Sequence, residues 1–106
     1  MELKGKCKED FEKWLAELPI KAILLSYDEF DAGEPYLFKE LPNSFKYGVY
    51  IDFFDSVGIY IGVNSYEKQK YWIGHAGGLM SKKLKTRHEA RTKAIEKAVE
   101  IYNSNN

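Results

Sequence analysis

Residues 43–57 have the sequence NSFKYGVYIDFFDSV, and the fold class depends on whether they form a strand or a helix. An alternating pattern would place Tyr47, Val49, Ile51 and Phe53 on one side of a strand rich in β-forming residues. A helical pattern instead gathers polar residues on one arc and apolar residues on the other, namely Tyr47, Val49, Tyr50, Phe53, Phe54 and Val57. The pattern alone therefore fits both structures.

The two ends of this segment favour a helix. Pro42 lies at the first turn, where the missing N–H of proline costs little. Gly58 follows the last turn, where glycine readily adopts the left-handed conformation that ends a helix. We therefore predict a helix over 43–57, with Asp52 and Asp55 on its polar face.

The chain after this helix predicts a hairpin and a second long helix. Residues 59–63 and 69–75 have strand character, and the short connection 64–68 implies antiparallel pairing. Residues 76–85 are expected to form a loop that contains Gly77, Gly78 and several lysines. Thr86 and Glu89 form a capping box at the start of the last helix, and residues 103–106 are expected to fray.

The chain before residue 43 predicts a first helix over 8–18, because Phe11, Trp14, Leu15 and Leu18 fall on one stripe and Pro19 ends it. Residues 20–27 fit a buried strand, although their apolar residues also recur with helical spacing. Residues 28–35 form an acidic loop. The prediction is a single α+β domain over 1–106, with a small antiparallel sheet of two to three strands packed against an N-terminal, a central and a long C-terminal helix.

Charge is distributed unevenly along the chain. Sixteen Lys and Arg balance sixteen Asp and Glu over 106 residues, but residues 1–64 carry a net −5 and residues 65–106 a net +5. A hydrophobic fraction of 44% excludes global disorder. No apolar run approaches the roughly 20 residues of a membrane span, and no signal sequence is evident, so we expect a cytoplasmic protein without a membrane partner. The single cysteine, Cys7, agrees with a reducing compartment.

The most informative chemistry is a basic cluster around the start of the last helix. Two arginines near a helix N-terminus repel each other and oppose the helix dipole, and a bound phosphate would relieve both effects. The alternative is that these side chains face the acidic half of the protein, particularly Asp52 and Asp55, or are simply solvated. The candidate residues for binding nucleic acid or another anion are Lys82, Lys83, Lys85, Arg87 and Arg91.

Aromatic residues lie close to this charge in the sequence. Tyr60, Tyr66, Tyr71 and Trp72 fall on or beside the predicted hairpin, and exposed rings on a sheet could stack on bases. The alternative is that they belong to the core. Because strand side chains alternate, Tyr71 and Trp72 must point to opposite faces.

The remaining polar groups suggest neither a catalytic nor a metal site. Asp52 and Asp55 form a candidate partner patch, and no histidine accompanies them on that helix. The acidic loop lacks the spacing of a calcium loop, and the pair of glycines at 77–78 lacks the Gly-Lys-Ser/Thr of a phosphate loop. Cys7, His75 and His88 have no metal-ligand spacing. The acidic residues of the loop over 28–35 are Asp28, Glu29, Asp31 and Glu34. We expect no catalytic residue, no metal and no cofactor.

Two blocks resemble small uncharacterised proteins of phages and mobile elements. They are LPNS, GVY and FDSVG within 41–58, and TRHEAR, AIEKA and IYN within 86–103, together about a third of the chain. The sequence departs from these proteins at 45–47, where FKY replaces Met-Gln-Trp. The resemblance implies a phage-type origin and brings no known activity.

A weaker resemblance is to the double-stranded-RNA-binding domain. In that family a glycine-containing loop with a Ser-Lys-Lys run precedes the last helix, as GGLMSKK at 77–83 does here. The departures are that the lysines of the family begin the helix itself, and that the family has three strands where this sequence firmly predicts two.

Together these features predict a small non-enzymatic binding protein of phage or mobile-element type that contacts nucleic acid through the basic loop and the C-terminal helix. The alternative is a protein-interaction module, either a charge-complementary oligomer or an inhibitor of a host protein.

Overall fold

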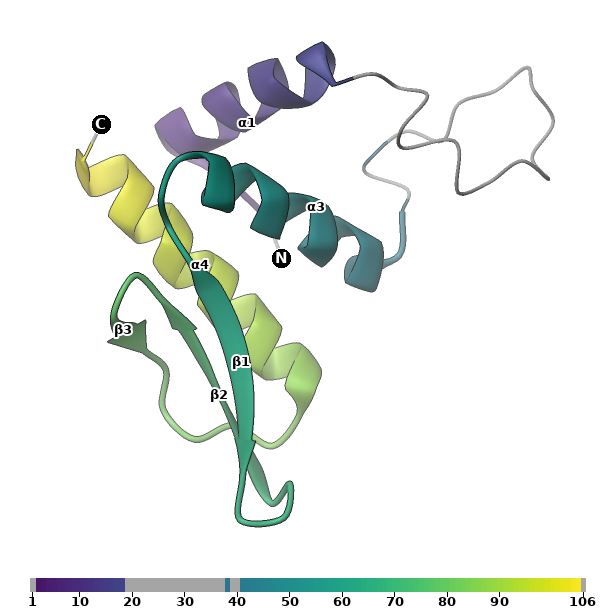
Figure 1. Cartoon of the computed structure of the whole chain (residues 1–106), viewed down its shortest axis with the longest axis vertical. Helices are drawn as coiled ribbons and strands as arrows, with labels where there is room; N and C mark the ends of the chain where they lie inside the picture. Colours follow the sequence, from purple (N-terminus) through teal and green to yellow (C-terminus); the bar gives the residue numbers. More distant parts are fainter. Residues whose placement is uncertain (1, 19–37, 39–40, 106) are drawn as a thin grey trace, which may run out of the picture.

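The fold is α+β, as the sequence predicts. The computed structural model describes residues 2–18, 38 and 41–105. These form three helices and one antiparallel sheet with the strand order β1-β2-β3 (Figure 1). The predictions for residues 20–27 and for the acidic loop, with Asp28, Glu29, Asp31 and Glu34, lie outside the described residues. The elements are α1 (Gly5–Glu17), α3 (Asn43–Ser56), β1 (Ile61–Tyr66), β2 (Tyr71–Ala76), β3 (Leu79–Met80) and α4 (Arg87–Asn105).

Segment 43–57 forms helix α3, which confirms the prediction made from its ends. Pro42 precedes the helix, and its carbonyl accepts hydrogen bonds from the N–H groups of Phe45 and Lys46. Gly58 has a φ of +81°, and the N–H of Ile59 donates to the carbonyl of Phe54 at 2.9 Å. The helix buries the aromatic residues of the predicted apolar arc, Tyr47, Tyr50, Phe53 and Phe54. Val57 of that arc follows the last helical residue and is 41% exposed.

The hairpin is antiparallel as predicted, but its strands begin two residues later than the predicted 59 and 69. The N–H of Ile59 is used to close the end of α3, so β1 starts only at Ile61. The turn contains no glycine, and its residues Glu67, Lys68 and Gln69 all have positive φ angles. A turn built without glycine leaves little signal in the sequence, which explains the wrong boundary.

A third strand interrupts the region that was predicted to be a loop over 76–85. Gly77 and Gly78 have φ angles of +52° and +91° and reverse the chain, so that Leu79 pairs with Ala76. Further along, Leu84 and Trp72 exchange backbone hydrogen bonds of 2.7 and 2.8 Å. The segment carrying the lysines is therefore the second edge of the sheet.

Helix α4 lies along one face of the sheet, and Thr86 caps its start as predicted, with the Glu89 carboxylate bonded to the Thr86 hydroxyl and not to its N–H. The N–H of Glu89 donates to the Thr86 hydroxyl at 3.1 Å, and that hydroxyl donates to the Glu89 carboxylate at 3.2 Å. The backbone of α4 passes so close to β2 that a Cβ on Gly74 would lie 2.1 Å from the carbonyl oxygen of Ala90. The glycine therefore sets the distance between helix and sheet.

The start of α1 contacts the end of α4, in the stretch 103–106 that is expected to fray. The helix continues to Asn105. The Asn103 side chain accepts a hydrogen bond from the N–H of Cys7 at 2.8 Å and donates one to the carbonyl of Lys4 at 3.0 Å. Lys4 provides no side-chain cap for α1, so Asn103 satisfies a free N–H of that helix from 96 residues away.

Replacing Asn103 with alanine should lower the free energy of unfolding by about 1–2 kcal/mol, the usual cost of losing an N-cap. Urea denaturation followed by circular dichroism measures this loss. Asn105→Ala provides a matched control, because the exposed Asn105 lies in the last turn of the same helix. Equal stability of the two variants would show that Asn103 does not cap α1.

Candidate nucleic-acid interface

The five cationic candidates are divided between two elements. Arg87 and Arg91 lie on the first two turns of α4, four residues apart. Lys82, Lys83 and Lys85 lie on the edge segment between β3 and α4, and all three are exposed. The cluster is therefore contributed by a helix and by the edge segment that precedes it.

Both arginines lie over aromatic rings. The guanidinium carbon of Arg87 is 4.8 Å from the centre of the Trp72 ring, and that of Arg91 is 5.1 Å from the centre of the Tyr47 ring. A ring face attracts a cation without neutralising it, so each guanidinium keeps its charge and its N–H donors for another partner.

A shallow groove of about 560 Å³ brings these two arginines together. One wall consists of consecutive residues along the outer edge of β1, and the other comes from α3 and the start of α4. None of the described residues that line the groove is acidic. The described lining is therefore positively charged, and it combines two aromatic rings with polar and aliphatic side chains. The lining residues are Tyr47, Ile51, Ile61, Gly62, Val63, Asn64, Ser65, Gln69, Trp72, Arg87 and Arg91.

Lys83 contacts a ring on the opposite face of the sheet. Its ammonium nitrogen is 4.6 Å from the centre of the Tyr71 ring. Trp72 is on the face that α4 covers, so Tyr71 is on the other, in agreement with the alternation expected from the sequence. The basic cluster therefore contacts aromatic rings on both faces of the sheet.

The predicted partner patch, Asp52 and Asp55, is exposed on α3. Within the described residues, ion pairs join Lys6 to Asp10 and Lys93 to Glu96, and none joins an aspartate of the patch to the basic cluster. Arg91 approaches α3 at Tyr47 instead. Within the described residues, the acidic patch and the basic cluster therefore do not neutralise each other through ion pairs.

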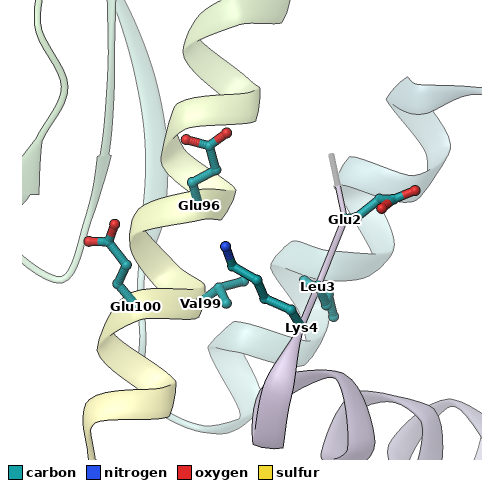
Figure 2. Close-up of a pocket in the computed structure, with 6 residues that line it drawn as sticks. All are labelled: Glu2, Leu3, Lys4, Glu96, Val99 and Glu100. Atoms are coloured by element: carbon teal, nitrogen blue, oxygen red, sulfur yellow. The ribbon is translucent and has the colours of Figure 1, made fainter.

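A second pocket of about 420 Å³ has the opposite character and was not predicted. It lies between the N-terminal segment and α4, and Figure 2 shows Lys4 extending towards Glu96 and Glu100. Its two walls are more than 90 residues apart in the sequence, so local patterns carry no signal for it. Its lining residues are Glu2, Leu3, Lys4, Glu96, Val99 and Glu100.

Cys7 is placed as a core residue. Its side chain is completely buried, and burial raises the pKa of the thiol to about 11, with a smaller effect from Asp10. It contacts α4 at Asn103, whereas His88 lies 15 residues earlier, about 22 Å along the helix. Within the described residues no group of three or more His, Cys, Asp or Glu is placed to hold a metal ion.

One titratable pair fastens α1 to α4. The Tyr102 hydroxyl donates a hydrogen bond to the Asp10 carboxylate. This bond, aided by Lys6, holds the pKa of Asp10 below its usual value. The same bond and burial raise the pKa of Tyr102 to about 12. The pair lies at the helix interface and outside the basic groove, which gives it a structural role.

The described helices and the comparisons with known proteins add two findings. No helix in the described part of the chain combines the length and the apolar character that a membrane span requires. Searches with family models, among curated proteins and among solved structures matched nothing to this chain.

Proposed function

We propose that this protein binds nucleic acid through the basic groove and the neighbouring lysines. The observation that carries the proposal is the environment of Arg87 and Arg91. Both line one groove without an acidic neighbour among its described lining residues, and both rest on neutral rings. Guanidinium groups in this state are well suited to contact phosphate oxygens.

The position of the arginines in the fold adds support. Both lie on the first two turns of α4, where the N-terminal end of the helix dipole attracts negative charge. Residues 59–88, which hold the sheet and its loops, contain six Lys or Arg and one Glu, a net charge of +5. The net charge of this region would therefore add to the attraction that the two arginines of the groove exert on a phosphate backbone.

The sequence resemblance to the double-stranded-RNA-binding domain supports the same class of partner. Strand β3 supplies a third strand, which the sequence alone did not predict firmly. The other departure remains, because Lys82 and Lys83 precede α4, which begins at Arg87.

The test is the affinity for labelled nucleic acid at different salt concentrations. We expect binding of a short oligonucleotide at about 50 mM salt that weakens strongly by about 200 mM, and a loss of about 100-fold or more in Lys82→Glu/Arg87→Glu. Fluorescence anisotropy measures both. Absence of binding at low salt would exclude the proposal.

A charge-matched control separates a specific surface from net charge. Lys8→Glu/Lys13→Glu changes the net charge by the same amount at two exposed positions of α1, away from the groove. It should reduce affinity only slightly. An equal loss in both double variants would show that binding follows total charge and not the groove.

The alternative is a protein-interaction module, and the separation of opposite charges within one molecule favours it. The groove is basic, while Asp52 and Asp55 are exposed and the second pocket is rich in glutamate. Under this alternative, light scattering would show an oligomer that dissociates with salt, and the protein would have no affinity for nucleic acid. A head-to-tail contact between such surfaces need not close into a dimer.

A further inference from the structure

The sheet has one face that packs on α4 and one that does not. Gly74 faces α4 at van der Waals distance, and Trp72 and Ala76 share its face. The alternate residues of β2 are Tyr71, Ile73 and His75, and all three are only half-buried. Their cross-strand partners on β1 are Tyr66, Asn64 and Gly62. We call this side of the sheet the open face.

Three side chains form a row across the open face. The rings of Tyr66 and Tyr71 are stacked, with centres 5.4 Å apart and planes 12° from parallel. The Lys83 ammonium approaches Tyr71 from the strand edge on the other side of β2, at 4.6 Å from the ring centre. Tyr66 ends the row at the outer edge of β1, where 37% of its surface is exposed. The row is an ordered aromatic stack next to a cation.

Polar groups continue the open face along the strands. The amide of Asn64 is 3.4 Å from the imidazole of His75, whose ring covers Gly62 so closely that a Cβ there would be 2.4 Å away. Met80 is the cross-strand partner of His75 on β3 and is 58% exposed. Amide, imidazole and thioether groups beside stacked rings provide hydrogen-bonding and apolar contacts for a flat heterocycle.

We propose that the open face binds the unpaired bases of single-stranded nucleic acid, with a base stacking on Tyr66 and the backbone held by Lys83. This inference rests on the proposed nucleic-acid binding and specifies its ligand class. In a duplex the bases are already stacked and paired, so their faces are not accessible to a side chain. Aromatic stacking on a positively charged sheet is the chemistry that selects a single strand.

The inference is tested with two probes, a labelled oligothymidylate and a labelled duplex of similar length. The wild-type protein should bind the single strand more tightly than the duplex. Tyr66→Leu keeps an apolar side chain in the strand and removes the ring, and it should weaken single-strand binding about ten-fold while leaving duplex binding unchanged. Tyr66→Trp should restore the affinity.

A control variant removes an exposed ring elsewhere on the protein, and the possible outcomes separate this inference from the proposed function. Phe45→Leu removes a ring that is 44% exposed but lies on α3, outside the open face, and it should leave both affinities unchanged. Preference for the duplex, or full single-strand affinity in Tyr66→Leu, would overturn the inference while the proposed function stands. Binding of neither probe at low salt would overturn the proposed function itself.

Discussion

Replacing Gly74 with alanine is expected to lower the free energy of unfolding by about 3 kcal/mol, because the added Cβ has no space. It would lie 2.1 Å from the carbonyl oxygen of Ala90 and 3.1 Å from the N–H nitrogen of Ala94. Both obstacles are backbone atoms of α4, so no side-chain rotation can relieve the overlap. The helix must move away from the sheet along its length, and the buried Ala90 and Ala94 lose their contacts.

The matched control is Gly48→Ala in α3. Apart from its chain neighbours and the nearby backbone of its own helix, no atom lies within 4 Å of the Cβ position at Gly48, and alanine favours the helix by about 0.5–1 kcal/mol over glycine. The two substitutions are chemically identical and should change stability in opposite directions. Urea denaturation followed by circular dichroism measures both. A Gly74→Ala protein as stable as wild type would mean that α4 does not pack directly on β2.

Helices α3 and α4 could be predicted from the sequence because their ends carry local signals. Pro42 and Gly58 indicated that α3 is a helix, and Thr86 with Glu89 indicated where α4 begins. Helix α1 begins at Gly5 instead of the predicted residue 8, because its cap is Asn103 from the other end of the chain. The strand boundaries were wrong where tertiary structure overrides the local pattern. Ile59 has strand character, yet its N–H closes α3, and three residues without glycine form the left-handed turn.

The candidate cations could be identified from charge alone, but their partners could not. Tyr47 and Arg91 are 44 residues apart, and only the packing of α3 beside α4 brings them together. The same holds for Asn103, whose partners lie at the other end of the chain. Only the alternation of Tyr71 and Trp72 was predictable, because it depends on neighbours in one strand.

The charges at the start of α4 are not arranged to stabilise the helix. Arg87 and Arg91 occupy its positive end, and Glu100 lies in the second half, the reverse of the order that the helix dipole favours. Glu89 in the capping box offsets this only locally. If the groove binds an anion as proposed, that anion would supply the missing negative charge, and ligand binding should then raise the stability of the helix.

Phe53→Ala should be the most destabilising substitution in the aromatic core, with a loss of about 3–5 kcal/mol. The Phe53 ring is 2% exposed and contacts rings from all three helices, among them Phe11 of α1 at 5.4 Å and Tyr102 of α4 at 5.8 Å. Tyr60→Ala is the control, since its ring is 70% exposed and should cost little.

The two tryptophans show whether this loss spreads through the whole molecule. Trp14 contacts Phe53 at 5.6 Å in the helical core, whereas Trp72 belongs to the sheet. With either tryptophan replaced by phenylalanine, the other reports unfolding of its own region by fluorescence. If 1–106 is one cooperative domain, Phe53→Ala should lower the urea midpoint equally for both reporters. A shift confined to Trp14 would mean that the sheet and α4 fold without α1 and α3. The groove would then lose the Tyr47 ring under Arg91, whereas the open face would remain intact.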